Sequence, residues 1–289
     1  MTTAIITNIL FPVDFSASCI AMGPYVKRAA TLFGANVSLI HVFDPGSYNG
    51  FELYVRRAPE VAEEHEEIAR HRLDSFLRAE FPVSEHPRIL LAGDAATKIA
   101  EVATGRFDLI IMPTHAGTFR RMLFGSTTAK VLNDARCPVL TSNHAPVIAP
   151  RPLAHRELLC ALGVDQDSER VLRFAHRVAT DAHSNLHLIH VIQTADRDLP
   201  VQLDLEEQVQ SQKRARAVQR IADLQRTAGS QAPVRIVAGP IKESLLEAVR
   251  GFDADVLIVG RSLESSANGG LRDLTYAIVR DSPFPVMSV

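Results

Sequence analysis

The sequence predicts two α/β domains of the same kind, each an open parallel sheet covered by helices. Unbroken apolar runs such as 109–112 (LIIM) are typical of strands buried on both faces of a parallel sheet. These runs alternate with helical patterns, and five strands joined by helical crossovers require a sheet covered on both faces. The second half of the chain then repeats the pattern of the first half, and 289 residues suit two domains of ordinary size.

The elements of the first repeat follow from apolar spacing and from residues typical of helix ends. Ser16 is a plausible N-cap for a helix that carries Ile20, Tyr25 and Val26, and Gly34 suits its C-terminal end. A charged helix is expected at 59–81, with Ile68 and Leu73 on its apolar side, and further helices at about 95–104 and 126–136. Pro113 should stop the strand before it. The expected strands are 9–13, 37–43, 88–92, 109–112 and 138–141.

The repeat is visible in five segments. Three of these segments in the second half are LLCALGVDQDS, DVLIVGRS and FPVMSV, which align with ILFPVDFSASC, DLIIMPTH and CPVLTS of the first half. The first alignment matches Asp165 to Asp14. Asp108 and Asp255 are separated by 147 residues, as are Pro138 and Pro285. A tandem duplication explains this better than two unrelated domains. We therefore expect domains at 1–144 and 155–289, joined by a proline-rich linker at 145–154.

Composition excludes several classes of protein. A formal net charge of −2 gives no electrostatic reason to expect nucleic acid or an anionic membrane as a partner. The first residues lack the basic head and cleavage site of a signal peptide, and no apolar run approaches the ~20 residues that span a bilayer. The three cysteines fit reduced thiols, with neither a disulfide framework nor a zinc site, so we expect a cytoplasmic protein.

The segment that most directly suggests a ligand is Gly125-Ser126-Thr127-Thr128, where a helix should begin after a loop. A helix N-terminus presents unpaired N–H groups and the positive end of the helix dipole, so it attracts phosphate. Glycine allows close approach and unusual dihedral angles, and the three hydroxyls can cap exposed amides or bind an anion.

This segment resembles the nucleotide loop of the universal stress protein family, whose pattern is glycine, two residues, glycine, nine residues, then glycine followed by serine or threonine. Pro113 takes the first glycine position, Ala116 the second, and Gly125-Ser126 matches the final pair. Eight residues separate Ala116 from Gly125, and Gly117 is the alternative for the second glycine.

The resemblance implies two Rossmann-like (adenine nucleotide alpha hydrolase-like) domains, each with strand order 3-2-1-4-5. It also implies an ATP site, with or without Mg²⁺, beyond the strand ends where the order reverses. In this chain the adenine would lie near Pro12, Val13, Asp14 and Val42, and the base and ribose over Met112 and Pro113. His115 and Ala116 would lead to the phosphates, which Gly125, Ser126, Thr127 and Thr128 would hold.

Simpler interpretations stand beside these roles. Asp14 can cap the following helix, Ser126 and Thr127 can be ordinary N-caps, and Arg120 with Arg121 can form a solvated basic edge. We expect no catalytic residue and no metal site. His41 and His190 occupy matching strand positions and suit packing, and His115 has no nucleophile or carboxylate nearby in sequence. His187 and His190 are three apart in a strand and point to opposite faces.

The second repeat departs from the pattern and should bind ATP poorly. Gly260 keeps the first glycine, but Leu263 replaces the second. Arg272 and Asp273 stand where the first repeat has Gly125 and Ser126. An arginine and an aspartate cannot form the same anion site.

The favoured hypothesis is a regulatory stress-response protein that binds ATP or a related adenine nucleotide in its first domain and acts on an unknown protein partner. Motifs of common hydrolases and P-loop proteins do not occur. The first alternative is a scaffold that has lost nucleotide binding, and the second is a slow ATPase with Asp14 or His115 as base. The family also implies that the last strands, 138–141 and 285–289, pair within one chain; a homodimer of chains stays open.

Overall fold

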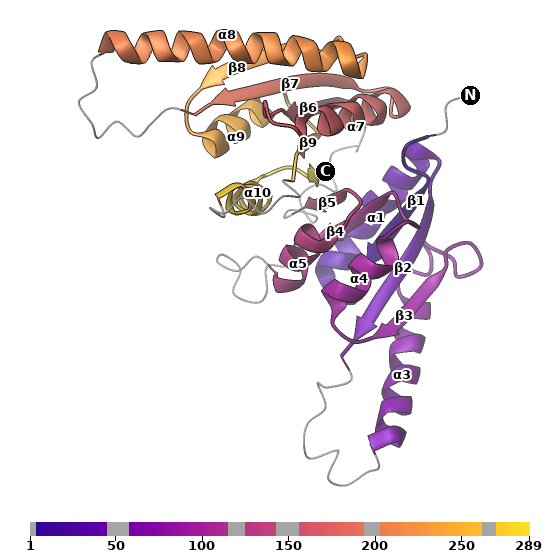
Figure 1. Cartoon of the computed structure of the whole chain (residues 1–289). Helices are drawn as coiled ribbons and strands as arrows, with labels where there is room; N and C mark the ends of the chain where they lie inside the picture. Colours follow the sequence, from indigo (N-terminus) through magenta and orange to yellow (C-terminus); the bar gives the residue numbers. More distant parts are fainter. Residues whose placement is uncertain (1–3, 45–57, 115–124, 143–155, 194–202, 262–269) are drawn as a thin grey trace. The chain divides into compact units, whose positions relative to one another are not determined.

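A computed structural model describes residues 4–44, 58–114, 125–142, 156–193, 203–261 and 270–289 of the chain. The chain divides into two compact units, Met1–Leu153 (unit 1) and Ala154–Val289 (unit 2). Both are α/β units in which parallel strands alternate with helices, which confirms the predicted fold class (Figure 1). Among the described residues, no helix combines the length and the apolar character needed to cross a bilayer.

The sheet of unit 1 is parallel and has the order β3-β2-β1-β4-β5. Neighbouring β1 and β4 are aligned by the pairs Ile9–Leu109 and Leu10–Ile110, and all four of these side chains are fully buried. Such unbroken burial is why the strands read as continuous apolar runs. The strands are β1 (Asn8–Pro12), β2 (Asn36–Phe43), β3 (Arg88–Ala92), β4 (Leu109–Pro113) and β5 (Val139–Ser142).

The helices of unit 1 are α1 (Ala17–Phe33), α3 (Ala58–Ser75), α4 (Ala95–Ala103) and α5 (Ser126–Asp134). Ser16 caps α1 as predicted, its Oγ accepting a hydrogen bond from the Cys19 N–H at 3.3 Å, and Gly34 ends it in the left-handed region at φ 63°. The predicted helix 59–81 is too long: α3 ends at Ser75, and Leu77 takes φ 47° in the turn that follows.

Two apolar residues that the sequence placed on helix core faces are in fact on the surface. Ile20 of α1 is 52% exposed and Ile68 of α3 is 51% exposed. Each lies outside the stripe that contacts the sheet, which for α3 is formed by Ala69 and Leu73.

Unit 2 repeats the architecture, with parallel strands in the order β8-β7-β6-β9-β10. Its core is formed by strand residues such as Leu159, Leu188 and Ile258, which are fully buried. The elements are β6 (Glu157–Ala161), α7 (Ser168–Asp181), β7 (Asn185–Ile192), α8 (Leu203–Ala228), β8 (Val234–Ala238), α9 (Ile241–Gly251), β9 (Val256–Val259), α10 (Gly270–Asp281) and β10 (Val286–Ser288).

One carboxylate per unit holds the foot of the central strand pair. In unit 1, Asp108 Oδ2 accepts hydrogen bonds from the N–H groups of Thr7 (2.9 Å) and Asn8 (3.0 Å) and from the Thr7 hydroxyl (2.7 Å). In unit 2, Asp255 Oδ2 accepts from the N–H groups of Arg156 (2.6 Å) and Glu157 (3.1 Å). The 147-residue spacing seen in the sequence therefore corresponds to a shared structural contact.

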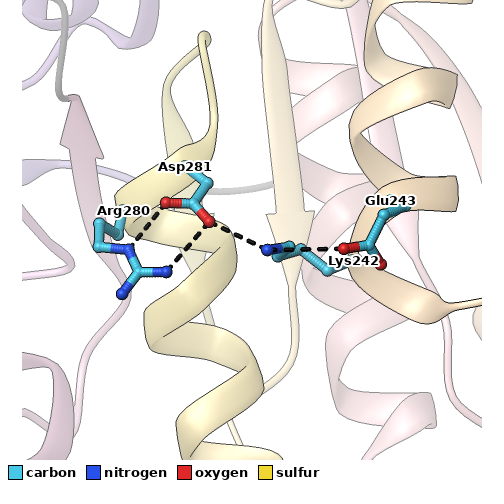
Figure 2. Close-up of polar contacts among 4 residues, drawn as sticks. All are labelled: Lys242, Glu243, Arg280 and Asp281. Carbon is cyan, nitrogen blue, oxygen red and sulfur yellow. Dashed lines mark hydrogen bonds and ion pairs between the residues drawn. The ribbon is translucent and has the colours of Figure 1, made fainter.

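Ion pairs join the last two helices of unit 2. In unit 2, Lys242 Nζ lies 3.1 Å from Asp281 and 3.5 Å from Glu243, and Arg280 binds both oxygens of Asp281 (Figure 2). The Arg280 hydrogen bonds, followed by those of Lys242, lower the pKa of Asp281. This pairing offsets the unfavourable placement of a carboxylate at the C-terminal end of α10.

Candidate functional site

A cavity of about 260 Å³ lies at the carboxyl ends of β1, β2 and β4 in unit 1, where α4 and α5 begin. This is the sheet edge at which parallel α/β folds bind ligands. Ten of the thirteen predicted site residues line it: Pro12, Val13, Asp14, Val42, Met112, Pro113, Gly125, Ser126, Thr127 and Thr128. His115, Ala116 and Gly117 lie outside the described residues, as do Arg120 and Arg121.

The start of α5 faces this cavity without a side-chain cap. Gly125 is the N-cap residue, no side chain caps the helix, and its first turn contains no acidic residue. The first bond of the helix runs from the Ala129 N–H to the Gly125 carbonyl at 2.9 Å, so the three preceding N–H groups have no intrahelical partner. By contrast, side chains of Ser16 and Asp94 cap α1 and α4.

The conformation of Gly125 corrects one sequence-based expectation. Its φ of −58° and ψ of 129° are open to any residue, so the backbone does not require glycine here. What glycine provides is the missing side chain, which leaves the first turn of α5 accessible from the cavity.

The hydroxyls of this segment are also placed differently from the prediction. Ser126, Thr127 and Thr128 were expected to cap the helix, but they form its first turn and Gly125 is the cap residue. Thr128 is 2% exposed, and its hydroxyl donates to the Pro113 carbonyl at 3.5 Å. Pro113 is the last residue of β4 and pairs with β5, whereas the sequence had it ending the strand before it.

Asp14 holds the turn before α1, whose N-cap is Ser16, and also lines the cavity. Its Oδ1 accepts hydrogen bonds from the Ser16 N–H at 3.0 Å and from the Cys19 thiol at 3.0 Å, which fixes the turn into α1. The residue is exposed and lines the cavity, because the turn follows directly from the end of β1. The turn contacts of Asp14 therefore leave it at the cavity, and its contact with a ligand stays a prediction.

Cys19 supports this carboxylate and was not identified from the sequence. Burial raises the pKa of its thiol to about 12, and the charge of Asp14 adds to that effect. The thiol therefore stays protonated at neutral pH and donates to Asp14.

His41 holds the chain at the end of β1. Its Nδ1 lies 2.8 Å from the Val13 carbonyl, so this nitrogen carries the proton and donates, since a carbonyl only accepts. Burial lowers the pKa of His41, and the bond to the Val13 carbonyl opposes that effect. In unit 2, His190 Nδ1 lies 2.8 Å from the Leu162 carbonyl. The matching histidines therefore link first and second strands, a more specific role than packing.

Sequence reasoning missed five residues that line the cavity. Two of them, Ala95 and Ile99, come from α4. The order of elements could have predicted them, because α4 follows β3 and begins at the same sheet edge. Ile40 and His41 neighbour Val42 on β2, and Cys19 comes one turn after Asp14.

The corresponding cavity of unit 2 is smaller, about 160 Å³, and the turn from β6 to α7 is two residues longer than the turn from β1 to α1. Ile9 pairs with Leu109 and Leu158 with Val256, so the register aligns Asp14 with Gly163. Asp165 lies two residues later, lines the cavity and accepts a hydrogen bond from the Ser168 hydroxyl at 2.7 Å. Counted from the strand, Asp165 is offset from Asp14 by two positions, but each aspartate stands two residues before the N-cap of the following helix.

Other features of the unit 2 cavity are structural. A Cβ atom on Gly260 would come within 3.0 Å of Val171 Cγ2, so this glycine is explained by close packing. Arg261 lines the cavity and is 8% exposed. Leu263 and the side chains of Arg272 and Asp273 lie outside the described part of the chain.

The two histidines of β7 have separate hydrogen-bonding partners. His187 Nε2 lies 2.8 Å from Glu157 Oε2, whereas His190 bonds the Leu162 carbonyl, so the two rings have separate partners. Within the described ranges, no group of three histidine, cysteine, aspartate or glutamate side chains is arranged to hold a metal ion.

Comparisons with known proteins define the family. The sequence model of the Universal stress protein family matches twice, at residues 6–142 and 155–289. The chain therefore belongs to the universal stress protein family, and the double match confirms the predicted tandem arrangement. No curated protein matches the chain in sequence.

Solved structures agree at the level of fold. A universal stress protein from Archaeoglobus fulgidus DSM 4304 has 20% sequence identity and a TM-score of 0.67, with 99% of this chain and 97% of that chain covered. A functionally unknown protein from Pseudomonas aeruginosa PAO1 has 19% identity and a TM-score of 0.64, with 98% and 92% covered. A putative universal stress protein from Pseudomonas aeruginosa UCBPP-PA14 has 17% identity and a TM-score of 0.62, with 98% and 93% covered.

Proposed function

We propose that unit 1 binds ATP or a related adenine nucleotide, and that the protein is regulatory rather than catalytic. The observation that carries this proposal is the start of α5. Its first-turn N–H groups face the cavity, with glycine at the cap position and no acidic side chain to neutralise the helix dipole. Such a helix start attracts phosphate.

The rest of the cavity suits the other end of a nucleotide. Val13, Val42 and Met112 provide apolar surface for a base, and Asp14 provides an acceptor at the exposed rim. Apolar walls with a few polar groups are typical of small-molecule sites. With Mg²⁺ or without it, the polyphosphate would extend toward Ser126 and Thr127.

Unit 2 is expected to bind the same ligand weakly or not at all. Its cavity is smaller, and glycine stands where unit 1 has Asp14. The proposed binding stoichiometry is therefore one nucleotide per chain.

Calorimetric titration of the full chain with ATP and Mg²⁺ tests the proposal. We expect binding by the wild type and a several-fold to tens-fold loss for Gly125→Val and Ser126→Ala, because a helix-terminus contact with an anion contributes about 0.3–2 kcal/mol. Gly251→Val is the matched control, since a Cβ at Gly251 meets no atom within 4 Å. No binding by the wild type at millimolar ATP, or an equal loss in the control, would contradict the proposal.

Mass spectrometry of small molecules released from freshly purified protein separates this function from a scaffold without a ligand. An adenine nucleotide recovered from wild type and depleted in Gly125→Val supports binding. Absence of nucleotide, together with a failed titration, would favour the scaffold.

A further inference from the structure

The outer helices α3 and α8 occupy the same place in their units, each connecting the second strand to the third, but they carry opposite charge. Residues 59–67 of α3 contain five glutamates and no lysine or arginine. Residues 208–222 of α8 contain four lysines and arginines and no acidic residue. The duplicated helix therefore carries an acidic stretch in unit 1 and a basic stretch in unit 2, and the acidic residues of α8 lie on either side of that stretch.

The basic residues of α8 form one stripe. Lys213, Arg216 and Arg220 have the spacing i, i+3, i+7, which places them on one helix face, and all three are exposed. The face that packs on the unit is formed by Ala217 and Ile221, so the stripe lies outside the core contact. In Figure 1 the first half of α8 extends past the sheet of unit 2. The structure gives these three cations no ion pair with any described residue.

The acidic residues of α3 repeat this spacing. Glu60, Glu63 and Glu67 are again at i, i+3 and i+7, and the described side chains of Glu63 and Glu67 are exposed. The ion pair that α3 makes within itself uses other residues, Glu66 with Arg70 at 3.8 Å. Glu63 and Glu67 have no ion pair within the described ranges.

We propose that α3 of one copy of this chain binds α8 of a second copy, with the Glu63–Glu67 stripe against the Lys213–Arg220 stripe. The equal spacing lets the carboxylates and cations of two aligned helices pair at once. A second copy of this chain is the favoured partner, because every copy carries both the acidic stripe and the basic stripe. The net charge of −2 also gives two copies little overall repulsion.

The charges define how such a contact behaves. Exposed ion pairs are individually weak and screened by salt, so the assembly should be reversible and should dissociate as ionic strength rises. Because two different helices meet, the contact either forms twice in a closed two-fold pair or repeats head to tail in longer assemblies.

Sedimentation velocity of the full chain tests the proposal through exchanged charges. We expect species heavier than the 31.7 kDa chain at about 50 mM salt and dissociation at about 500 mM. Glu63→Lys/Glu67→Lys reverses the α3 stripe, so that both stripes carry net positive charge, and Arg216→Glu/Arg220→Glu reverses the α8 stripe, so that both carry net negative charge. Each variant alone should assemble about tenfold more weakly, and a 1:1 mixture should recover the wild-type affinity because every contact is again complementary.

Matched controls place the same charge changes elsewhere on the surface. Glu85→Lys/Glu247→Lys and Lys27→Glu/Arg136→Glu change exposed residues outside α3 and α8, and should leave assembly unchanged. Far-ultraviolet circular dichroism verifies that every variant is folded.

Several results would overturn the proposal. The wild type could stay at 31.7 kDa at low salt, or it could form an assembly that neither charge variant weakens. The mixture of variants could fail to recover the wild-type affinity, or the control variants could weaken assembly as much as the test variants. If the wild type is monomeric and only added anionic vesicles or nucleic acid bind the α8 stripe, α8 serves a different partner and the proposal is wrong.

Discussion

Replacing Asp108 with alanine should destabilise unit 1 substantially, because this carboxylate holds the foot of β1 against β4. Its Oδ2 accepts three hydrogen bonds, two of them from the backbone N–H groups of Thr7 and Asn8. Removal of the acceptor leaves those half-buried amides unpaired. Each unpaired amide costs about 1–3 kcal/mol of stability when fully buried, and less where water can reach it. We therefore expect a loss of about 2–4 kcal/mol in the free energy of unfolding.

The duplicated carboxylate provides the comparison. Asp255→Ala removes an acceptor from only two N–H groups, and one of these belongs to Arg156, which is exposed and can be hydrated. Its cost should be smaller, about 1–2 kcal/mol. Asp108→Asn keeps an acceptor oxygen but loses the charge, so it should lie between wild type and Asp108→Ala.

Urea unfolding followed by circular dichroism measures these differences, and hydrogen exchange of the peptide 4–12 localises them. Asp108→Ala should accelerate exchange in β1 and leave unit 2 unchanged. A loss below about 0.5 kcal/mol for Asp108→Ala, or a larger loss for Asp255→Ala, would refute the reasoning, because either result means that counting buried amides does not rank these sites.

Two further predictions concern ionisation. Hydrogen bonds from Thr97, its hydroxyl first, lower the pKa of Asp94 to about 2, below its ordinary 3.8, so the stabilisation from this cap is present above pH about 3.8 and lost as pH falls through about 2. Asp94→Asn should therefore be less stable than wild type in urea at pH 7, and the difference should shrink as pH falls through about 2; a constant difference would contradict this. Burial raises the pKa of Cys19 and Cys160 to about 12, so thiol reagents at pH 8 should modify native Cys137 first, and rapid labelling of either buried thiol would be inconsistent with the structure.

Most of the fold could be predicted from the sequence because its strands are buried on both faces. The run Leu109–Ile111 is fully buried, and such a run leaves an uninterrupted apolar signal. The early end of α3 could not be predicted, because it depends on the left-handed conformation of Leu77. No residue typical of turns marks this position in the sequence. Ile20 and Ile68 misled the assignment of core faces because apolar residues also occur on surfaces.

The candidate site was predictable where chain order and topology coincide. Asp14 and Gly125 each stand at an element end, and the sheet order brings those ends together. The thiol of Cys19 escaped prediction because its contact with Asp14 depends on the turn between them. The strand register aligns Asp14 with Gly163, and the two-residue offset of Asp165 from the strand could not be read from the sequence of the repeats.

The repeated histidine bond has a practical consequence for experiments on this chain. His41 and His190 each hold the carbonyl that follows a first strand, and in unit 1 the histidine lines the same cavity as the start of α5. Each half of the molecule therefore serves as an internal control for the other. If equivalent replacements in the two halves lower stability equally, the replaced residues have a structural role. A replacement at His41 whose effect exceeds that of its twin at His190 isolates whatever the first half does beyond folding.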